Sequence, residues 1–441
     1  MLSGDVENSN FIIDQTNIRN VLAFYQLSNF FSVPNVAKAA FNYIERCFTT
    51  LCENEDFLQV DANLFLKVLA SSCLHVHSER EVFDAADSWL NFNAERRKKF
   101  AKKILLKVRL PLLSGEFVKN ILKGSSSFTK SKESSDCLKE TIEGKNECFK
   151  NKQCAYFKHR YCDQRTFNTV IFGGFNEVSK KTLKTVSLVR GSNSADTKAL
   201  PAMSGARRRH RAVFLKGEIY VFGGFDGDKE HVRSVDRYSL LSNAWHAETS
   251  VPDNRRDYSV CAFMRKIFVF CGKIKPTTST KSCLEYGERA WKMTKRMRRA
   301  RSDAACAVYE GRVVVAGGFG SDCWAMRHVE SYDGVTWSEM PKMVETHVSH
   351  SLVAAGSKLF VIHFFDSEVF DSVSGKFVAF KLHPDHDSFN NVISNGSELV
   401  IYEEETGTKL TYDIDRATWS RGFCQATENL SDFTCVQVPF Y

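Results

Sequence analysis

The sequence predicts a multidomain protein in which an all-α N-terminal part is followed by an all-β propeller. Two observations lead to this fold class. Up to residue 122, apolar residues recur with the period of an α-helix. From residue 167 onward they recur with the period of a strand, and a unit of 40–50 residues repeats, which is typical of β-propeller blades.

The N-terminal part contains several amphipathic segments. "TNIRNVLAFYQLSNF" places Val21, Leu22 and Tyr25 on one face, and "VPNVAKAAFNYIERCF" repeats the pattern. "SEREVFDAADSWLNF" begins with a capping box made by Ser78 and Glu81. Helices of this length, joined by short connections, predict a bundle or an array of helical hairpins.

Residues 123–166 differ in composition, because they are rich in Ser, Lys and Glu and have little apolar periodicity. We therefore expect a flexible linker here. Cys148, Cys154, His159 and Cys162 lie near its end, but their spacing is irregular and contains no C-x-x-C pair. The sequence therefore predicts neither a metal site nor a cofactor.

The C-terminal repeats carry three markers in constant order: glycines at the end of a strand, a tyrosine in a later strand, and a tryptophan after it. We expect the glycines to be structural, since glycine allows positive φ and close backbone approach near the hub. We place the glycine-bearing strand, the second of its blade, toward that hub. The aromatic residues should pack one blade on the next. The markers are Gly173, Gly174, Gly223, Gly224, Gly272, Gly317 and Gly318; Tyr238, Tyr286 and Tyr332; and Trp245, Trp291, Trp337 and Trp419.

The order Gly-Gly, Tyr, Trp at this spacing resembles the kelch repeat. Six copies begin at residues 168, 218, 267, 312, 358 and 398, so a six-bladed kelch propeller is expected over residues 167–441. The fifth and sixth copies lack the double glycine. The terminal segment "FTCVQVPFY" is expected to complete the first blade and close the ring.

The helical part resembles the BACK domain of BTB–BACK–kelch (Kelch-like) proteins, on the segment that begins "LHVHSEREVFDAADSWLNF". Upstream, "TNIRNVLAFYQLSNF" resembles the final helices of a BTB domain. The resemblance implies a C-terminal BTB remnant over residues 1–34 and a BACK domain over residues 35–122. Most of a BTB domain has no counterpart here, so the chain is either a fragment or a short form that recruits a ligase poorly.

The resemblance also implies a function. Kelch-like proteins are substrate-recognition adaptors of cullin-3–RING ubiquitin ligases, in which the propeller binds the target and the BTB domain makes most of the cullin-3 contact. The alternative is a cytoskeletal kelch protein that binds actin. Either protein would be cytoplasmic. The sequence shows neither a catalytic motif nor an apolar run of about 18 residues, so no enzyme and no membrane protein is predicted.

The candidate partner-binding residues lie in loops that lead into successive blades. Three of these loops are basic, and equivalent loops surround one mouth of a propeller channel, so their arginines should converge on an acidic protein segment. Any one arginine could instead serve local packing. Nucleic acid is disfavoured because no nucleic-acid-binding motif is present. The predicted residues are Arg207, Arg208, Arg209, Arg211, Arg255, Arg256, Lys295, Arg296, Arg298, Arg299 and Arg301, together with Phe225, Asp226 and Trp324 on neighbouring loops.

Overall fold

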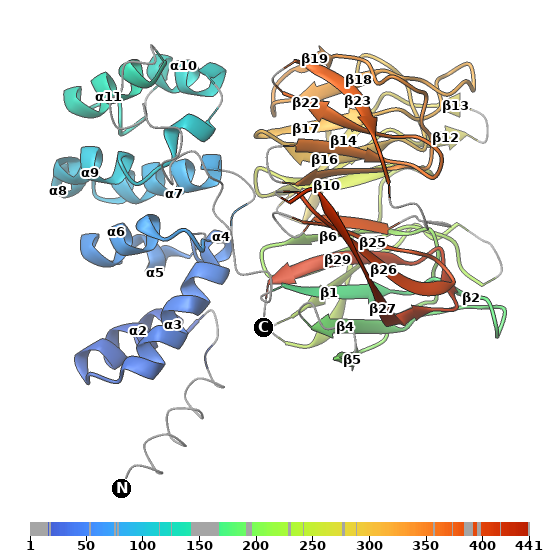
Figure 1. Ribbon diagram of the computed structural model, residues 1–441, viewed down its shortest axis with the longest axis horizontal. Helices are drawn as coiled ribbons and strands as arrows, with labels where there is room; N and C mark the ends of the chain where they lie inside the picture. The colour runs from blue at the N-terminus through green and yellow to red at the C-terminus, as the bar shows by residue number, and fades with distance from the viewer. Residues whose placement is uncertain are drawn as a thin grey trace, which may run out of the picture. The chain divides into compact units, whose positions relative to one another are not determined.

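The computed structural model describes two stretches of the chain (Figure 1). These are residues 16–142 without 17–18, 53, 75, 77–78, 114 and 125, and residues 167–439 without 191–195, 228–230, 241, 276–277, 288, 356–357, 373, 383–390, 395–397 and 415. The chain divides into two compact units between Thr166 and Phe167. The predicted capping residue Ser78 and the cysteines of segment 143–166 lie outside the described residues. No described helix is long and apolar enough to cross a membrane.

The described residues of the first unit form helices and the turns that join them. Its helices are α2 (Val21–Phe30), α3 (Pro34–Arg46), α4 (Phe48–Leu51), α5 (Glu55–Leu58), α6 (Ala62–Ala70), α7 (Glu79–Phe92), α8 (Ala94–Arg97), α9 (Ala101–Leu105), α10 (Gly115–Lys123) and α11 (Lys132–Ile142). Asp61 caps α6, since its carboxylate accepts hydrogen bonds from the N–H groups of Asn63 and Leu64. Pro34 begins α3 at a position where a missing N–H costs nothing.

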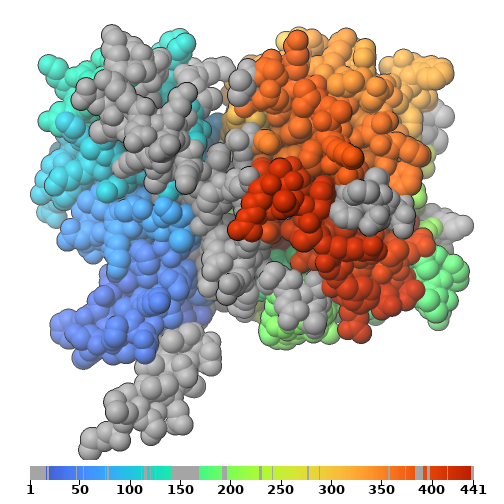
Figure 2. Space-filling model, in the orientation of Figure 1, coloured from blue at the N-terminus to red at the C-terminus, as the bar shows by residue number. Residues whose placement is uncertain are grey.

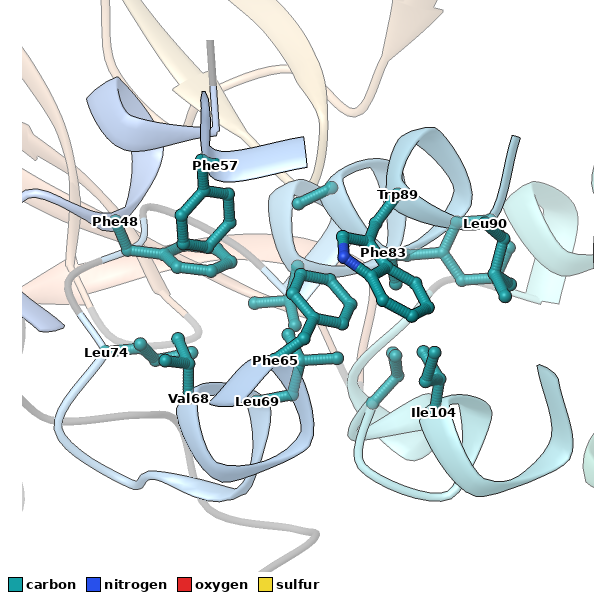
Figure 3. Close-up of a cluster of buried hydrophobic side chains, with 14 of the residues drawn as sticks. Phe48, Phe57, Phe65, Val68, Leu69, Leu74, Phe83, Trp89, Leu90 and Ile104 are labelled. Carbon is teal, nitrogen blue, oxygen red and sulfur yellow. The ribbon is translucent and has the colours of Figure 1, made fainter. Parts of the chain in front are cut away.

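One hydrophobic core joins these helices (Figure 3). The rings of Phe65 on α6 and Trp89 on α7 stack with centroids 4.7 Å apart. The indole N–H of Trp89 donates to the carbonyl of Val60 at 3.1 Å, and the guanidinium of Arg97 lies 3.8 Å from the Trp89 ring. Trp89 is therefore fixed at its polar atom and on its face as well as by burial.

The predicted linker contains ordered structure, which corrects the expectation of a flexible segment for residues 126–142. Helix α11 lies within it, and Phe128 and Leu138 are fully buried in the helical core. Phe128 packs against Phe83 at 5.0 Å, and the hydroxyl of Ser126 donates to Asp87 at 2.8 Å. The polar composition of this segment did not indicate a helix, because a short amphipathic helix needs only a few buried apolar residues to pack against the core.

Six four-stranded antiparallel sheets, which are the blades of a propeller, make up most of the described second unit (Figure 1). Two small sheets accompany them: β28 (Leu430–Ser431), β2 (Phe175–Asn176) and β3 (Lys181–Thr182) form one, and β12 (Lys273–Lys275) and β13 (Thr278–Ser279) form the other. From the innermost to the outermost strand, the blades are as follows. Blade 1 is β29 (Thr434–Pro439), β1 (Phe167–Phe172), β4 (Val186–Arg190) and β5 (Thr197–Leu200). Blade 2 is β6 (Arg211–Leu215), β7 (Glu218–Phe222), β8 (Val235–Ser239) and β9 (Ala244–Glu248). Blade 3 is β10 (Ser259–Phe263), β11 (Lys266–Phe270), β14 (Cys283–Gly287) and β15 (Ala290–Thr294).

The second half of the propeller repeats the arrangement. Blade 4 is β16 (Ala305–Tyr309), β17 (Arg312–Ala316), β18 (Val329–Tyr332) and β19 (Trp337–Met340). Blade 5 is β20 (Ser351–Ala355), β21 (Lys358–Ile362), β22 (Ser367–Asp371) and β23 (Lys376–Phe380). Blade 6 is β24 (Asn391–Ser394), β25 (Glu398–Tyr402), β26 (Thr406–Asp413) and β27 (Thr418–Glu428). Blades 5 and 6 are complete although their sequences lack the double glycine.

The ring closes through the C-terminal strand, as predicted. Strand β29 pairs antiparallel with β1 from Phe167↔Pro439 to Phe172↔Thr434. The first strands of the six blades contact one another in a closed circle, β29–β6–β10–β16–β20–β24 and back to β29. In space-filling view, propeller residues from the green first blade to the red last blade form one packed body (Figure 2).

The innermost strand of each blade is its first strand, which corrects the expectation that the glycine-bearing second strand lies nearest the hub. The glycines sit at the far end of that second strand, against the loop that enters the next blade. A Cβ on Gly173 would lie 2.4 Å from the carbonyl oxygen of Arg207, and one on Gly317 would lie 2.4 Å from that of His347. Both glycines have positive φ, so neither space nor backbone conformation admits a side chain there.

The tryptophans hold neighbouring blades together. Trp245, Trp291 and Trp337 each donate their indole N–H to a carbonyl on the segment leaving the preceding blade, those of Pro201, Thr249 and Lys295, at 2.8–2.9 Å. Their rings also contact Phe172, Phe222 and Phe270, each at the end of the preceding blade's second strand. Each tryptophan therefore packs across a blade boundary and satisfies its only donor there.

Candidate functional site

Three of the predicted partner-binding arginines are buried inside the blades. Arg207, Arg255 and Arg301 occupy equivalent positions in the loops entering blades 2, 3 and 4, and each is at most 1% exposed. The Nη1 of Arg301 donates to the carbonyls of Gly317 and His328 at 2.9 and 2.8 Å. Arg207 and Arg255 bond the equivalent carbonyls of their own blades. Partner contact was the wrong expectation for these three residues, which tie each entry loop to its blade.

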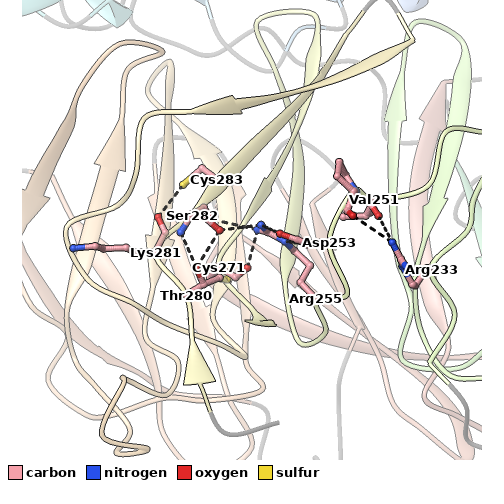
Figure 4. Close-up of polar contacts among 10 residues, drawn as sticks. Arg233, Val251, Asp253, Arg255, Cys271, Thr280, Lys281, Ser282 and Cys283 are labelled. Atoms are coloured by element: carbon pink, nitrogen blue, oxygen red, sulfur yellow. Dashed lines mark hydrogen bonds and ion pairs between the residues drawn. The ribbon is translucent and has the colours of Figure 1, made fainter. Parts of the chain in front are cut away.

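Each buried arginine has a carboxylate partner. Arg207 bonds Asp236 at 2.7 Å, and Arg301 bonds Glu330 at 2.6 Å. Arg255 differs, because its Nε donates to Asp253 of its own loop at 2.6 Å (Figure 4). A charge without such a partner would be costly to bury.

Blade 5 uses a histidine in place of the arginine. His347 Nε2 lies 2.9 Å from Glu368, which also accepts the N–H groups of Val344 and Glu345 at 2.8 Å each. Burial opposes ionisation of Glu368, but these hydrogen bonds outweigh it and lower the pKa of the carboxyl.

Sequence reasoning missed the acids Asp236, Glu330 and Glu368. A signal was present, since each lies two residues before the aromatic marker of its strand, in "VDRYS", "VESYD" and "SEVFD". Blade 3 has Leu284 at that position, which explains why Arg255 turns to its own loop.

The channel mouth carries both signs of charge. The turn residues Asp432, Arg209, Asp257, Asp303 and Ser349 share positive φ at equivalent positions of successive blades. Backbone hydrogen bonds connect neighbours among them: the N–H of Arg209 donates to Asp432, that of Asp303 to Asp257, and that of Ser349 to Asp303. Three aspartates therefore lie in this ring beside one arginine.

Salt bridges further reduce the basic character of the mouth. Arg209 Nε lies 2.9 Å from Asp432, and Arg208 Nη1 lies 3.7 Å from the same carboxylate. The hydrogen bond and charge of Asp432 raise the pKa of Arg209. Lys273 similarly lies 3.6 Å from Asp257. The predicted purely basic mouth is thus corrected to a mixed, largely neutralised one.

The other predicted residues belong to several elements of blades 2 and 3 and differ in exposure. Arg211 is exposed at the start of the inner strand β6, Arg256 is half-buried, and Lys295 and Arg296 are exposed beyond the outer strand β15. Phe225 and Asp226 are half-buried, and Phe225 packs against His231 at 5.8 Å. Asp226 also lines a hollow of about 330 Å³ beside Arg207.

Arg298, Arg299 and Trp324 do come together. They line a groove of about 740 Å³, here called the blade 3–4 groove, between the loops of blades 3 and 4. Trp324 is 76% exposed in the loop between β17 and β18. Sequence reasoning missed three further cations of the same groove, Lys281, Arg327 and Lys342.

Comparison with known proteins supports the two-part architecture. The BACK family pattern (BTB And C-terminal Kelch) matches residues 21–123, and the kelch motif matches residues 206–252, which span blade 2. No match to a BTB domain is found.

Curated relatives are Kelch-like proteins. The chain is 25% identical over 274 residues to Kelch-like protein 7 of Homo sapiens, covering 59% of this chain and 43% of that protein. It is 22% identical to Kelch-like protein 35 of Mus musculus, covering 71% of this chain and 64% of the relative. For Kelch-like protein 41b of Danio rerio the identity is 22%, with 80% and 70% covered. The chain therefore spans less than half the length of the Kelch-like protein 7 sequences it matches. The patterns and the six-bladed ring show a BACK domain followed by a kelch β-propeller, and in this the chain is similar to Kelch-like proteins.

Proposed function

We propose that this chain is a non-enzymatic substrate-recognition adaptor of a cullin-3–RING ubiquitin ligase. The observation that carries the proposal is the order of its parts, a BACK domain followed by a kelch propeller, which it shares with Kelch-like relatives. In such an adaptor the propeller holds the target protein and the helical part connects it to the ligase.

The helical unit offers an apolar surface for the ligase side. Leu27, Phe30 and Phe31 lie at the end of α2 and are 52%, 80% and 67% exposed. The rings of Phe30 and Phe31 are in edge-to-face contact at 5.1 Å. Adjacent exposed aromatic residues favour protein contact, because leaving them in water forfeits the free energy of burying them.

The propeller supplies the surface for the target protein. Its blades are rigid sheets closed into a ring, so the loops between strands are free to vary in sequence while the scaffold holds their positions. The blade 3–4 groove is a concave surface built by such loops. Among the described residues no group of three or more His, Cys, Asp or Glu side chains is arranged to hold a metal ion.

The test is a pull-down of the purified full chain with cullin-3, alongside co-sedimentation with F-actin. We expect weak retention of cullin-3, since most of a BTB domain has no counterpart here, and we expect Phe30→Asp/Phe31→Asp to reduce that retention by about tenfold, as for loss of two interface aromatics. Phe92→Asp is the matched control, since Phe92 is also exposed in the helical unit, at 48%. Retention of F-actin without cullin-3, while another Kelch-like protein binds cullin-3 under the same conditions, would replace the adaptor by an actin-binding protein.

A further inference from the structure

We propose that the blade 3–4 groove binds a short acidic peptide segment whose carboxylates flank an apolar side chain. This inference rests on the proposed role of the propeller in target recognition and names the chemistry of the target. It also moves the binding site away from the channel axis, where the sequence alone had placed it.

The lining of the groove is mainly positive, although Arg299 also pairs at 3.3 Å with Glu339, which does not line it. Five cationic residues line it, and Asp322 is the one carboxylate among its lining residues. The cations come from four separate loops and are Lys281, Arg298, Arg299, Arg327 and Lys342. Like charges at such proximity repel one another, so an anion that enters gains attraction from several directions at once.

Hydrogen bonds hold the backbone of Arg298 and Arg299 and the guanidinium of Arg327 before any ligand arrives. Buried Glu330 accepts the backbone N–H of Arg298 at 2.7 Å and that of Arg299 at 3.2 Å, and is itself anchored by Arg301. Arg327 donates to the carbonyl of Val344 at 3.3 Å. The guanidinium of Arg298 also donates from Nε to the carbonyl of Trp337 at 3.4 Å. A side chain held in this way loses less entropy on binding, and the planar fork of arginine suits a carboxylate.

Trp324 provides the apolar part of the groove. Its loop is a tight turn in which Gly320 N–H donates to the Trp324 carbonyl at 2.9 Å and Asp322 accepts the Trp324 N–H at 3.3 Å. The turn therefore presents the ring outward from a defined position. Met326 lies beside it in the groove lining. Such a surface fits an aliphatic or aromatic side chain between two carboxylates.

The surroundings favour a short peptide over a nucleic acid. A nucleic-acid backbone carries a charge on every residue and needs a basic track that continues beyond one groove. The neighbouring channel mouth instead carries Asp257, Asp303 and Asp432. Because Asp432 and Asp257 are paired with neighbouring cations, the mouth does not extend the basic track toward the axis, whereas a short segment ends within the groove.

The test uses fluorescence anisotropy with the purified full chain. The probe is a fluorescein-labelled 12-residue peptide in which pairs of Glu alternate with single Leu, and its control has Gln in place of every Glu. We expect the Glu peptide to bind at least about tenfold more tightly, with an affinity that falls as salt is raised.

Three variants locate the binding. Arg298→Glu/Arg327→Glu and Trp324→Ala should each weaken binding of the Glu peptide by about tenfold or more. Lys292→Glu is the control, since Lys292 is exposed on the outer strand of blade 3 and does not line the groove, and it should change affinity less than about twofold. Far-UV circular dichroism verifies that each variant is folded.

Three results would overturn the inference: equal affinity for the Gln peptide, unchanged affinity in both groove variants, or tighter groove-dependent binding of a single-stranded oligonucleotide. Cullin-3 retention separates this inference from the proposed function. Loss of peptide binding with cullin-3 still retained removes the groove ligand alone, whereas loss of cullin-3 retention with peptide still bound removes the adaptor role alone.

Discussion

Arg301 and Glu330 form an ion pair at 2.6 Å in which both side chains are completely buried. Arg301 belongs to the loop entering blade 4, and Glu330 to β18, the third strand of the same blade. The same carboxylate accepts the N–H groups of Arg298 and Arg299. A single buried acid therefore fixes both the entry loop and the basic wall of the blade 3–4 groove.

Removing that acid should destabilise the propeller strongly. We expect Glu330→Ala to lower the free energy of unfolding by about 3–5 kcal/mol, because the Arg301 charge stays buried without its partner. Glu339→Ala is the matched control, since Glu339 pairs with Arg299 at 3.3 Å while both side chains are about half exposed; it should cost less than about 1 kcal/mol. Urea denaturation followed by the β-sheet signal measures both, and equal losses would contradict this account.

Substitution of two glycines by alanine can distinguish the stability cost of a steric clash from that of an unfavourable backbone conformation. Gly317 and Gly375 both have positive φ, at 62° and 66°. A Cβ on Gly317 would lie 2.4 Å from the carbonyl oxygen of His347, whereas a Cβ on Gly375 meets nothing within 4 Å. We expect Gly375→Ala to cost about 1–2 kcal/mol, the usual penalty of a left-handed residue. Gly317→Ala should cost more than twice as much or prevent folding, as judged by thermal unfolding of both variants; similar melting temperatures would refute the role of close approach.

His210 should make the propeller sensitive to acid. Burial, with the nearby charges of Arg207 and Arg211, lowers the pKa of His210 to about 3. Between that value and the ordinary 6.5, the unfolded state binds a proton that the folded state does not, so stability falls as the pH falls through this window. From pH 7 to pH 5 this one residue should remove about 2 kcal/mol.

Unfolding free energies measured across that pH range test the prediction. His210→Gln should flatten the pH dependence, whatever its effect on stability at neutral pH. His246, exposed on β9, serves as the control, and His246→Gln should leave the slope as it is. An unchanged slope for His210→Gln would show that other groups cause the acid sensitivity.

Ring closure by β29 can be tested with one substitution on each face of this strand. Val438 on β29 is 1% exposed, whereas its neighbour Gln437 is half-buried and points to the other side of the strand. Val438→Asp should destabilise the propeller by about 3 kcal/mol or more, because it buries a carboxylate among apolar side chains. Gln437→Asp should cost far less. Soluble yield and urea midpoints compare the two, and similar effects would argue against a buried inner face.

The repeat markers predicted the propeller because they occupy positions where the same packing recurs from blade to blade. Gly317 lies where two backbones meet, and Trp337 lies across a blade boundary, so each is fixed by local geometry that the spacing reveals. Blades 5 and 6 form without the double glycine, since strand pairing rather than any one glycine defines a blade. The linker prediction was wrong for residues 126–142 because average composition does not report the few buried positions, such as Phe128, that order a segment.

The binding surface could be predicted only in part. Arg301 and Arg299 are two residues apart in one basic run, yet one is buried and the other lies in the groove, since alternation along the entry loop decides which way a side chain points. Asp432 pairs with Arg209 in space but lies 223 residues away in the sequence, so no local sequence pattern predicts the pair. Lys281 and Lys342 also line the groove, but they lie on other loops, so no local sequence pattern places them there.

The first blade is assembled from the two ends of the propeller segment, so this blade cannot be completed until the last strand has been synthesised. When the ribosome has made β1, β4 and β5, the inner edge of that sheet has no partner until β29 is translated last. We expect nascent chains to depend on chaperones throughout this interval. A chain that stopped before β29 would leave the inner edge of this sheet without its partner strand.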